Sequence, residues 1–341
     1  MKSKIINATT KILDGKDLEF DEVQEVIRQI TEGKATNAQI ASFLTALRFK
    51  GETVQEITAA ATVMQDKCIT INTDTPEAID IVGTGGDCAG TFNISTAAAF
   101  IAAGAGCKVA KHGNRSASSK TGAADLLEAF GVDINLPPDK SLDIFKKTGI
   151  CFLYAPDYHP CMQYVSPVRQ EIGIRTLFNI LGPLINPAKT KIQMIGVYDR
   201  NLTEPVAKVL KNLGISRGMT VHGADGLDEA TITDKTFISE IKDNKIISYE
   251  ISPEDFGLKR AVLKDIQGGN TEENAAIIAD IFSGKEKGAK YDIAVFNAAL
   301  LIYLTGNSKD IKEGIERAKA AIDSSSALKI FENFISLSKK K

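Results

Sequence analysis

The sequence has few cysteines and histidines, and neither type is arranged as a metal site or a disulfide framework. The five cysteines are scattered and odd in number, no Cys-x-x-Cys pair occurs, and the three histidines do not stand at zinc-ligand spacing around them. This pattern excludes a zinc finger or a disulfide-stapled secreted domain. We expect the thiols to be reduced and to pack as small hydrophobic side chains.

Long apolar runs and an excess of one charge are also missing. The N-terminal residues, Met1–Asn7, lack the apolar region of a signal peptide, and the longest apolar stretch, Thr96–Gly106, is too short to span a bilayer. The chain has 41 basic and 43 acidic residues, with a pI near 6.0. We therefore expect no membrane and no nucleic acid as a partner, and we expect a cytoplasmic location.

The 341 residues, 43% of them hydrophobic, are enough for a large core and for two domains. Residues 1 to about 70 show helical periodicity in three places, around Val23–Ile30, Ile40–Leu47 and Ile57–Met64. Thr36 with Gln39, and Thr53 with Glu56, have the spacing of capping boxes. Such short helices need another element to pack on.

From Pro76 onward, short apolar runs alternate with helical stretches, which is typical of an α/β domain with a largely parallel sheet. The predicted strands are 79–82, 108–110, 151–154, 193–197 and 219–221, and the predicted helices are 97–103, 123–130, 142–147 and 202–213. Residues 231–251 alternate like a hairpin, 164–178 form one helical stretch, 182–187 form a rigid turn, and the tail from Thr271 is helical.

A glycine segment, Asp80-Ile-Val-Gly-Thr-Gly-Gly-Asp87, follows the first predicted strand. A dinucleotide fingerprint needs glycine at position 88, where Cys88 stands, and a Walker A loop needs Lys-Ser/Thr after Gly90. The segment is therefore either a plain tight turn or a loop whose main-chain N–H groups bind phosphate. Next, Asn93-Ile-Ser-Thr96 is suited to cap a helix from Ala97, or to contact an anion or a metal ion from that helix end.

Two further polar segments follow predicted strands. The loop Lys111–Lys120 is rich in basic, amide and hydroxyl groups, and its place at the end of a strand favours ligand binding over a solvated surface loop. We assign His112 a positioning role only. After the strand at 219–221, Asp228 and Glu229 are either an ordinary acidic turn or ligands for magnesium beside a diphosphate.

Taken together, these segments resemble the anthranilate phosphoribosyltransferases, of the nucleoside-phosphorylase-like class. The resemblance also rests on Val168-Arg-Gln-Glu171, Gly173-Ile-Arg-Thr176 and Gly182–Pro187, and it covers nearly the whole chain. It implies a helical N-terminal domain (1–75, completed by helices near 160–185), a larger α/β domain (76–341) and a homodimer formed through the helical part. The implied reaction joins anthranilate and phosphoribosyl diphosphate, with release of diphosphate, in tryptophan biosynthesis.

The resemblance also implies site residues. Those for phosphoribosyl diphosphate are Gly83, Gly86, Asp87, Thr91, Asn93, Ile94, Ser95, Thr96, Lys111, Asn114 and Ser119, with Lys111 acting electrostatically and no general acid or base assigned. Those for anthranilate are Gly83, His112, Asn114 and Arg169. Ser95, Asp228 and Glu229 are implied ligands of two Mg²⁺ ions. The chain departs from the pattern at Ala123, where relatives often carry a hydroxyl, and at Cys88.

Three alternatives remain at this point. A pyrimidine nucleoside phosphorylase would share the fold, but its usual Lys-His-Ser-Thr-Gly-Gly loop is missing. A non-catalytic nucleic-acid-binding relative would show a basic excess and degraded magnesium motifs. A close transferase could use a different aromatic acceptor, because few residues decide the choice of acceptor.

Overall fold

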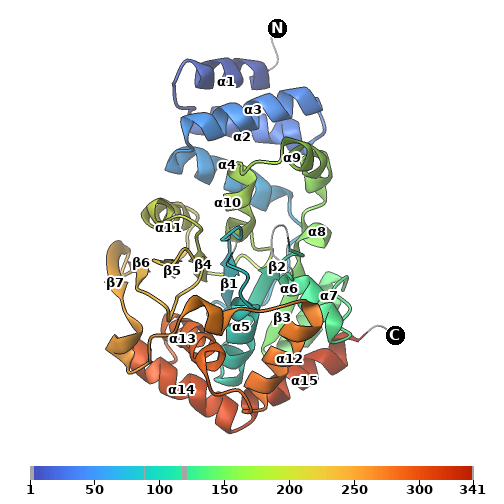
Figure 1. Ribbon diagram of the computed structural model, residues 1–341. Helices are drawn as coiled ribbons and strands as arrows, with labels where there is room; N and C mark the ends of the chain where they lie inside the picture. Colours follow the sequence, from blue (N-terminus) through green and yellow to red (C-terminus); the bar gives the residue numbers. More distant parts are fainter. Residues whose placement is uncertain (1–3, 88, 117–120, 340–341) are drawn as a thin grey trace.

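The computed structural model describes residues 4–87, 89–116 and 121–339, and Figure 1 shows their arrangement. A bundle of helices lies at one end of the molecule and a sheet covered by helices forms the rest. The strands are β1 (Ile79–Gly83), β2 (Val109–Gly113), β3 (Ile150–Tyr154), β4 (Ile192–Gly196), β5 (Arg217–Gly223), β6 (Thr236–Lys242) and β7 (Lys245–Ile251). No helix in the described residues combines the length and the apolar character needed to cross a membrane.

The N-terminal bundle begins with α1 (Lys4–Leu13), α2 (Phe20–Thr31), α3 (Asn37–Lys50) and α4 (Val54–Lys67). Both predicted capping boxes are present, at the starts of α3 and α4. The apolar residues of α2 that recur at helical spacing are all fully buried. They pack in one core with residues of two helices from later in the chain, α9 (Ser166–Ile172) and α10 (Leu177–Leu184). The four N-terminal helices thus have the packing partner that the sequence required.

The sheet has the order β3-β2-β1-β4-β5-β6-β7. The first five strands in this order run parallel, and β6 and β7 are antiparallel. The prediction of a largely parallel sheet is confirmed. Parallel pairing aligns the carboxyl ends of the strands, so that Gly83 lies beside Gly196 and Gly113 beside Tyr154. The segments that follow β1, β2 and β5 therefore meet at one edge of the sheet.

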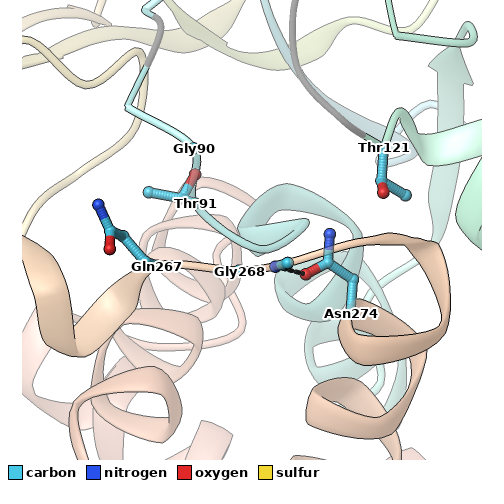
Figure 2. Close-up of a pocket in the computed structure, with 7 residues that line it drawn as sticks. Gly90, Thr91, Thr121, Gln267, Gly268 and Asn274 are labelled. Carbon is cyan, nitrogen blue, oxygen red and sulfur yellow. Dashed lines mark hydrogen bonds between the residues drawn. The ribbon is translucent and has the colours of Figure 1, made fainter.

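The helices of the α/β part lie on both faces of this sheet (Figure 1). They are α5 (Ile94–Gly104), α6 (Ala123–Ala129), α7 (Pro138–Thr148), α8 (Ala155–Tyr158), α11 (Thr203–Asn212), α12 (Thr271–Phe282), α13 (Ala289–Leu304), α14 (Ile311–Asp323) and α15 (Ser326–Ser338). Short 3₁₀ helices cover Pro160–Tyr164, Arg200–Leu202, Pro253–Phe256 and Leu263–Ile266. The last of these leads into a segment that passes beside Gly90 and Thr91, where Gln267 pairs with Thr91 (Figure 2).

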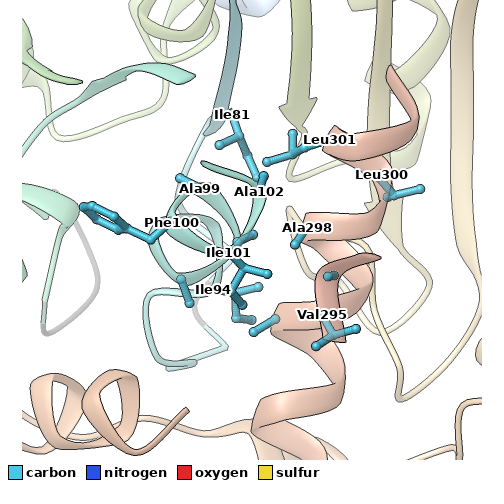
Figure 3. Packing of buried hydrophobic residues seen from close by; sticks show 14 of the residues in the cluster. Ile81, Ile94, Ala99, Phe100, Ile101, Ala102, Val295, Ala298, Leu300 and Leu301 are labelled. Atoms are coloured by element: carbon cyan, nitrogen blue, oxygen red, sulfur yellow. The ribbon is translucent and has the colours of Figure 1, made fainter. Parts of the chain in front are cut away.

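The main core lies between the sheet and helices α5 and α13, which pack side by side (Figure 3). Small side chains on α5, such as Ala98 and Ala102, are fully buried and let α13 approach closely. Alternate residues of one strand face different cores: Met194 belongs to this core, and Ile195 belongs to the core shared with the N-terminal bundle. Burial on both faces explains why the central strands are mostly apolar, with Asp80 and Gln193 as buried polar exceptions.

The structure corrects three local predictions. Residues 164–178 are not one helical stretch, because Gly173 takes a left-handed conformation (φ 66°) that ends α9, and Thr176 starts α10. The predicted turn at 182–187 is partly helical, since α10 runs to Leu184 with Pro183 inside it. Helix α5 begins at Ile94, so that Ser95 and Thr96 lie within its first turn.

The predicted hairpin is confirmed for β6 and β7, with residues 231–235 outside it. Its turn is made by Asp243 and Asn244, which both have positive φ. The free cysteines include Cys107, Cys151 and Cys161, all buried, and Cys68, which is partly exposed.

Candidate active site

A cleft of about 810 Å³ opens at the carboxyl ends of β1 and β2. One wall is formed by the glycine segment, the start of α5, and residues 113–116 and 121–123. The opposite wall comes from residues 155–185, which include α9 and α10. Ligands of open α/β sheets bind at such strand ends. Nearly all of the predicted site residues that fall within the described chain line this cleft.

The glycine segment is shaped around Asp228. Gly85 and Gly86 have positive φ (73° and 83°), and the Gly85 N–H donates to Asp228 Oδ2 over 2.6 Å. A Cβ on Gly83 would lie 2.3 Å from the same oxygen. Glycine at position 83 therefore leaves the space that the carboxylate occupies. The N–H of Gly85 is used inside the protein.

Lys111 is a buried cation at the base of the cleft, with 3% of its surface exposed. Its Nζ donates to Ile81 O over 2.7 Å and to Ser95 Oγ over 3.3 Å. Burial lowers the pKa of Lys111, and the charges of Asp80 and Glu229 act in the opposite direction. The ammonium group thus lies where β1, β2 and the start of α5 converge.

Three carboxylates, Asp87, Asp228 and Glu229, line the same part of the cleft. Burial raises the pKa of Asp228, and the charge of Asp87 raises it further. Burial and the charge of Asp228 likewise raise the pKa of Glu229, against the effect of Lys111. Neither Asp228 nor Glu229 makes an ion pair with a described residue. Carboxylates crowded in this way have a strong electrostatic demand for a cation.

The start of α5 places two of its predicted polar residues on the cleft. Asn93 and Ser95 line it, together with Ile94 and Thr91. The Nδ2 of Asn93 donates to Thr121 O over 3.0 Å. Thr96 does not line the cleft: it is 1% exposed, because the helix begins earlier than predicted and turns this side chain inward.

The opposite wall carries Arg169, on α9. Its guanidinium lies 5.9 Å from the centre of the Phe178 ring, and burial lowers its pKa. Within the described chain it makes no ion pair. A half-buried arginine without an acidic partner, beside an aromatic ring, is suited to bind a planar carboxylate.

His112 also lines the cleft and faces a second histidine, His159, with ring centroids 5.2 Å apart. Burial lowers the pKa of His112 to about 3 and that of His159 to about 4. Both imidazoles are therefore neutral at pH 7. Asn114 is exposed at the mouth of the cleft, and its Oδ1 accepts from the N–H of Arg115.

Sequence reasoning gave no role to His159 or to Arg175, which both line the cleft. Arg175 donates to the carbonyl of Gly86 and lies 4.0 Å from the centre of the Tyr198 ring. The available signal was the Gly173-Ile-Arg-Thr176 motif, but only the break after α9 shows that its arginine reaches the glycine segment. Ser119 and Cys88 lie outside the described residues, and Ala123 lines the cleft.

Comparison with known proteins gives a consistent family. Residues 75–328 match the glycosyl transferase family a/b domain, and residues 6–68 match the helical bundle domain of the same family. The anthranilate phosphoribosyltransferase of Ruminiclostridium cellulolyticum is 50% identical over 98% of this chain and 97% of its own length. That of Endomicrobium trichonymphae is 52% identical, over 98% of this chain and 99% of its own length.

Solved structures agree. The anthranilate phosphoribosyltransferase of Thermus thermophilus superimposes with a TM-score of 0.92 at 40% identity, over 97% of this chain and 98% of that one. The Saccharomyces cerevisiae enzyme, solved in complex with PRPP and Mg, gives a TM-score of 0.91 at 31% identity, over 99% of this chain and 98% of that one. With relatives about half identical over nearly their full length, this chain belongs to the anthranilate phosphoribosyltransferase family of glycosyltransferases.

Proposed function

We propose that this protein transfers the phosphoribosyl group of phosphoribosyl diphosphate to the amino group of anthranilate, giving N-(5-phosphoribosyl)-anthranilate and diphosphate in tryptophan biosynthesis. The observation that carries this proposal is the two-sided cleft, with Lys111 and a glycine segment on one wall and Arg169 on the other. The structures of the Saccharomyces cerevisiae relative include complexes with PRPP and Mg and with 4-fluoroanthranilate.

Phosphoribosyl diphosphate is assigned to the wall made by the strand ends and α5. The cleft geometry supports contacts from Gly83, Gly86, Asp87, Thr91, Asn93, Ile94, Ser95, Lys111 and Asn114. Ser119, expected from the family resemblance, lies outside the described residues. Thr96 is left out of the assignment because its side chain is buried away from the cleft.

Two Mg²⁺ ions per chain are assigned to Ser95, Asp228 and Glu229. No group of three or more His, Cys, Asp or Glu side chains in the described part of the chain is arranged to hold a metal ion by itself. Two carboxylates and a hydroxyl nonetheless fit magnesium, which keeps several waters and takes the remaining oxygens from substrate phosphates. When bound, the ions would neutralise charge on the diphosphate.

Anthranilate is assigned to the opposite side of the cleft. Arg169 would bind its carboxylate, Asn114 would offer an amide, and Gly83 and His112 would lie along the same channel. Because burial keeps His112 neutral, this imidazole can line the channel without competing with Arg169 for the carboxylate. Two reactants held face to face gain most of the rate from orientation.

The residues then support a displacement at C1 of the ribose. The C1–O bond to diphosphate breaks and takes its electron pair to the leaving group, whose charge Lys111 stabilises. The neutral aromatic amine attacks C1 from the opposite face, a C1–N bond forms, and the nitrogen loses one proton to water. No described residue needs to act as a strong base, because the protonated aromatic amine is acidic.

The assay uses purified protein, magnesium and phosphoribosyl diphosphate, and follows the loss of anthranilate fluorescence together with diphosphate release. We expect both to proceed in equal amounts. Unchanged anthranilate would reject the proposal. Phosphate-dependent cleavage of pyrimidine nucleosides in a parallel incubation would establish the nucleoside phosphorylase instead.

We also propose a homodimer that forms through the helical bundle, in the cytoplasm. Leu13 on α1 and Phe49 on α3 are 70% and 92% exposed, which leaves large apolar side chains uncovered on this bundle. Phe49→Glu should shift the mass in light scattering toward the monomer. Ile247→Glu, at a half-exposed apolar residue of β7, is the matched control and should leave the mass unchanged.

A further inference from the structure

A strap, residues 267–274, runs from the chain before α12 into its first turn and packs beside residues 90–92, which follow the glycine segment. The N–H of Gly268 donates to Gly90 O over 2.9 Å, and Gln267 forms an isolated antiparallel bridge with Thr91. Figure 2 shows the strap passing next to Gly90 and Thr91. The strap thus holds Gly90 and Thr91, which lie between the glycine segment and α5.

The strap also reaches the segment that precedes α6. The hydroxyls of Thr271 and Thr121 are 3.2 Å apart, and the carbonyl of Thr121 accepts from Asn93 Nδ2 over 3.0 Å. A closed ring of contacts results: from residues 90–93 to Thr121, on to Thr271, and back through Gly268. Residues 90–93 and Thr121, which line the cleft, are thus connected to each other and to the strap.

The strap packs closely against the main chain of Phe92. A Cβ on Gly268 would lie 2.3 Å from Asn274 Oδ1 and 2.8 Å from the main chain of Phe92, so only glycine allows the strap to lie this near. Asn274 is 2% exposed, and its Oδ1 accepts from the N–H of Gly269 over 2.9 Å. A polar cavity of about 170 Å³ lies between the strap and the side chains of Thr91 and Thr121 (Figure 2).

We propose that the strap positions the phosphoribosyl diphosphate site, with Thr271 as a positioning residue that acts through Thr121 on Asn93. This inference rests on the proposed function, because Thr91 and Asn93 are assigned there to that substrate. Thr271 does not line the main cleft. Its effect on substrate must therefore pass through the ring of contacts.

The first test is steady-state kinetics of Thr271→Val, which keeps the shape and removes the hydroxyl. Loss of one hydrogen bond in the ring should raise the KM for phosphoribosyl diphosphate about two- to tenfold, with the KM for anthranilate unchanged. Thr271→Ser should restore the wild-type KM. In the double variant Thr121→Val/Thr271→Val, the second substitution should raise the KM for phosphoribosyl diphosphate by a smaller factor than it does alone. Thr10→Val, at an exposed position of α1, is the control.

The second test is amide hydrogen exchange of the unmodified chain and the variants without substrate, which does not depend on the reaction. Thr271→Val should speed exchange in residues 89–93 and 121–123, and Thr271→Ser and Thr10→Val should not. Unchanged exchange there, or a KM for phosphoribosyl diphosphate within error of wild type in Thr271→Val, would overturn the positioning role. Turnover of the unmodified chain separately tests the proposed function.

Discussion

Replacing Gly83 with alanine should disable the site through a single added carbon. The new Cβ would lie 2.3 Å from Asp228 Oδ2 and 2.9 Å from its carboxyl carbon. Ordinary carbon–oxygen contacts begin at about 3.3 Å, so the carboxylate must retreat by roughly 1 Å. It would then lose its 2.6 Å hydrogen bond from the Gly85 N–H.

The rest of Asp228 cannot follow this movement. Its carbonyl oxygen packs against Gly196, where a Cβ would lie only 1.5 Å away, so the main chain is fixed and the side chain must rotate. A displacement of about 1 Å at a catalytic constellation can lower the rate by about 10²-fold, which is about 2.7 kcal/mol. We expect kcat/KM for Gly83→Ala to fall by about that factor.

The assay is the fluorescence-based turnover of anthranilate at saturating magnesium. Gly288→Ala is the matched control, because its Cβ would meet only the end of the flexible Glu286 side chain, at 2.8 Å, and it should keep wild-type rates. A value of kcat/KM for Gly83→Ala within twofold of wild type would show that Asp228 tolerates the added carbon.

Three further predictions follow from the cleft. Arg169→Ala should raise the KM for anthranilate about 10- to 100-fold, the worth of a charge-assisted hydrogen bond, and should leave that for phosphoribosyl diphosphate nearly unchanged; equal changes in both constants would reject its role. The double variant Asp228→Asn/Glu229→Gln should lose most turnover and any response to magnesium titration, whereas near-normal activity would exclude metal binding there. Burial lowers the pKa values of His112 and His159 to about 3 and 4, so below pH 6.5 the unfolded state binds more protons than the folded state. The free energy of unfolding should therefore fall as the pH drops from 6.5 toward 4, by up to about 1.4 kcal/mol per pH unit for each histidine. Denaturant unfolding of His112→Asn/His159→Asn across this range should show a flatter pH dependence, and an unchanged slope would contradict the assignment.

Much of the fold follows from local patterns. Capping boxes and helical periodicity predicted the helices that begin at Asn37 and Val54, and alternation of strands and helices predicted the parallel sheet. Strand ends followed by glycine or polar residues also predicted which segments meet, because parallel strands align their carboxyl ends. Such signals are short-range and are therefore visible in the sequence.

The parts that were missed depend on contacts between distant residues. A left-handed Gly173 ends α9, and the four-residue break before α10 directs Arg175 toward Gly86. The burial of Thr96 depends on where α5 begins, which its Ala-rich sequence leaves open by one turn. The strap, residues 267–274, has no local signature, because its role comes from contacts with residues 90–92 and Thr121.

A crystal structure of this protein with phosphoribosyl diphosphate, magnesium and a slow anthranilate analogue bound together would locate both substrates in the cleft directly. We expect diphosphate oxygens beside Lys111 and the glycine segment, metal ions on Asp228 and Glu229, and the analogue's carboxylate paired with Arg169. A structure in which the analogue's carboxylate lies away from Arg169, or the diphosphate lies outside the segment from Gly83 to Thr91, would contradict this assignment.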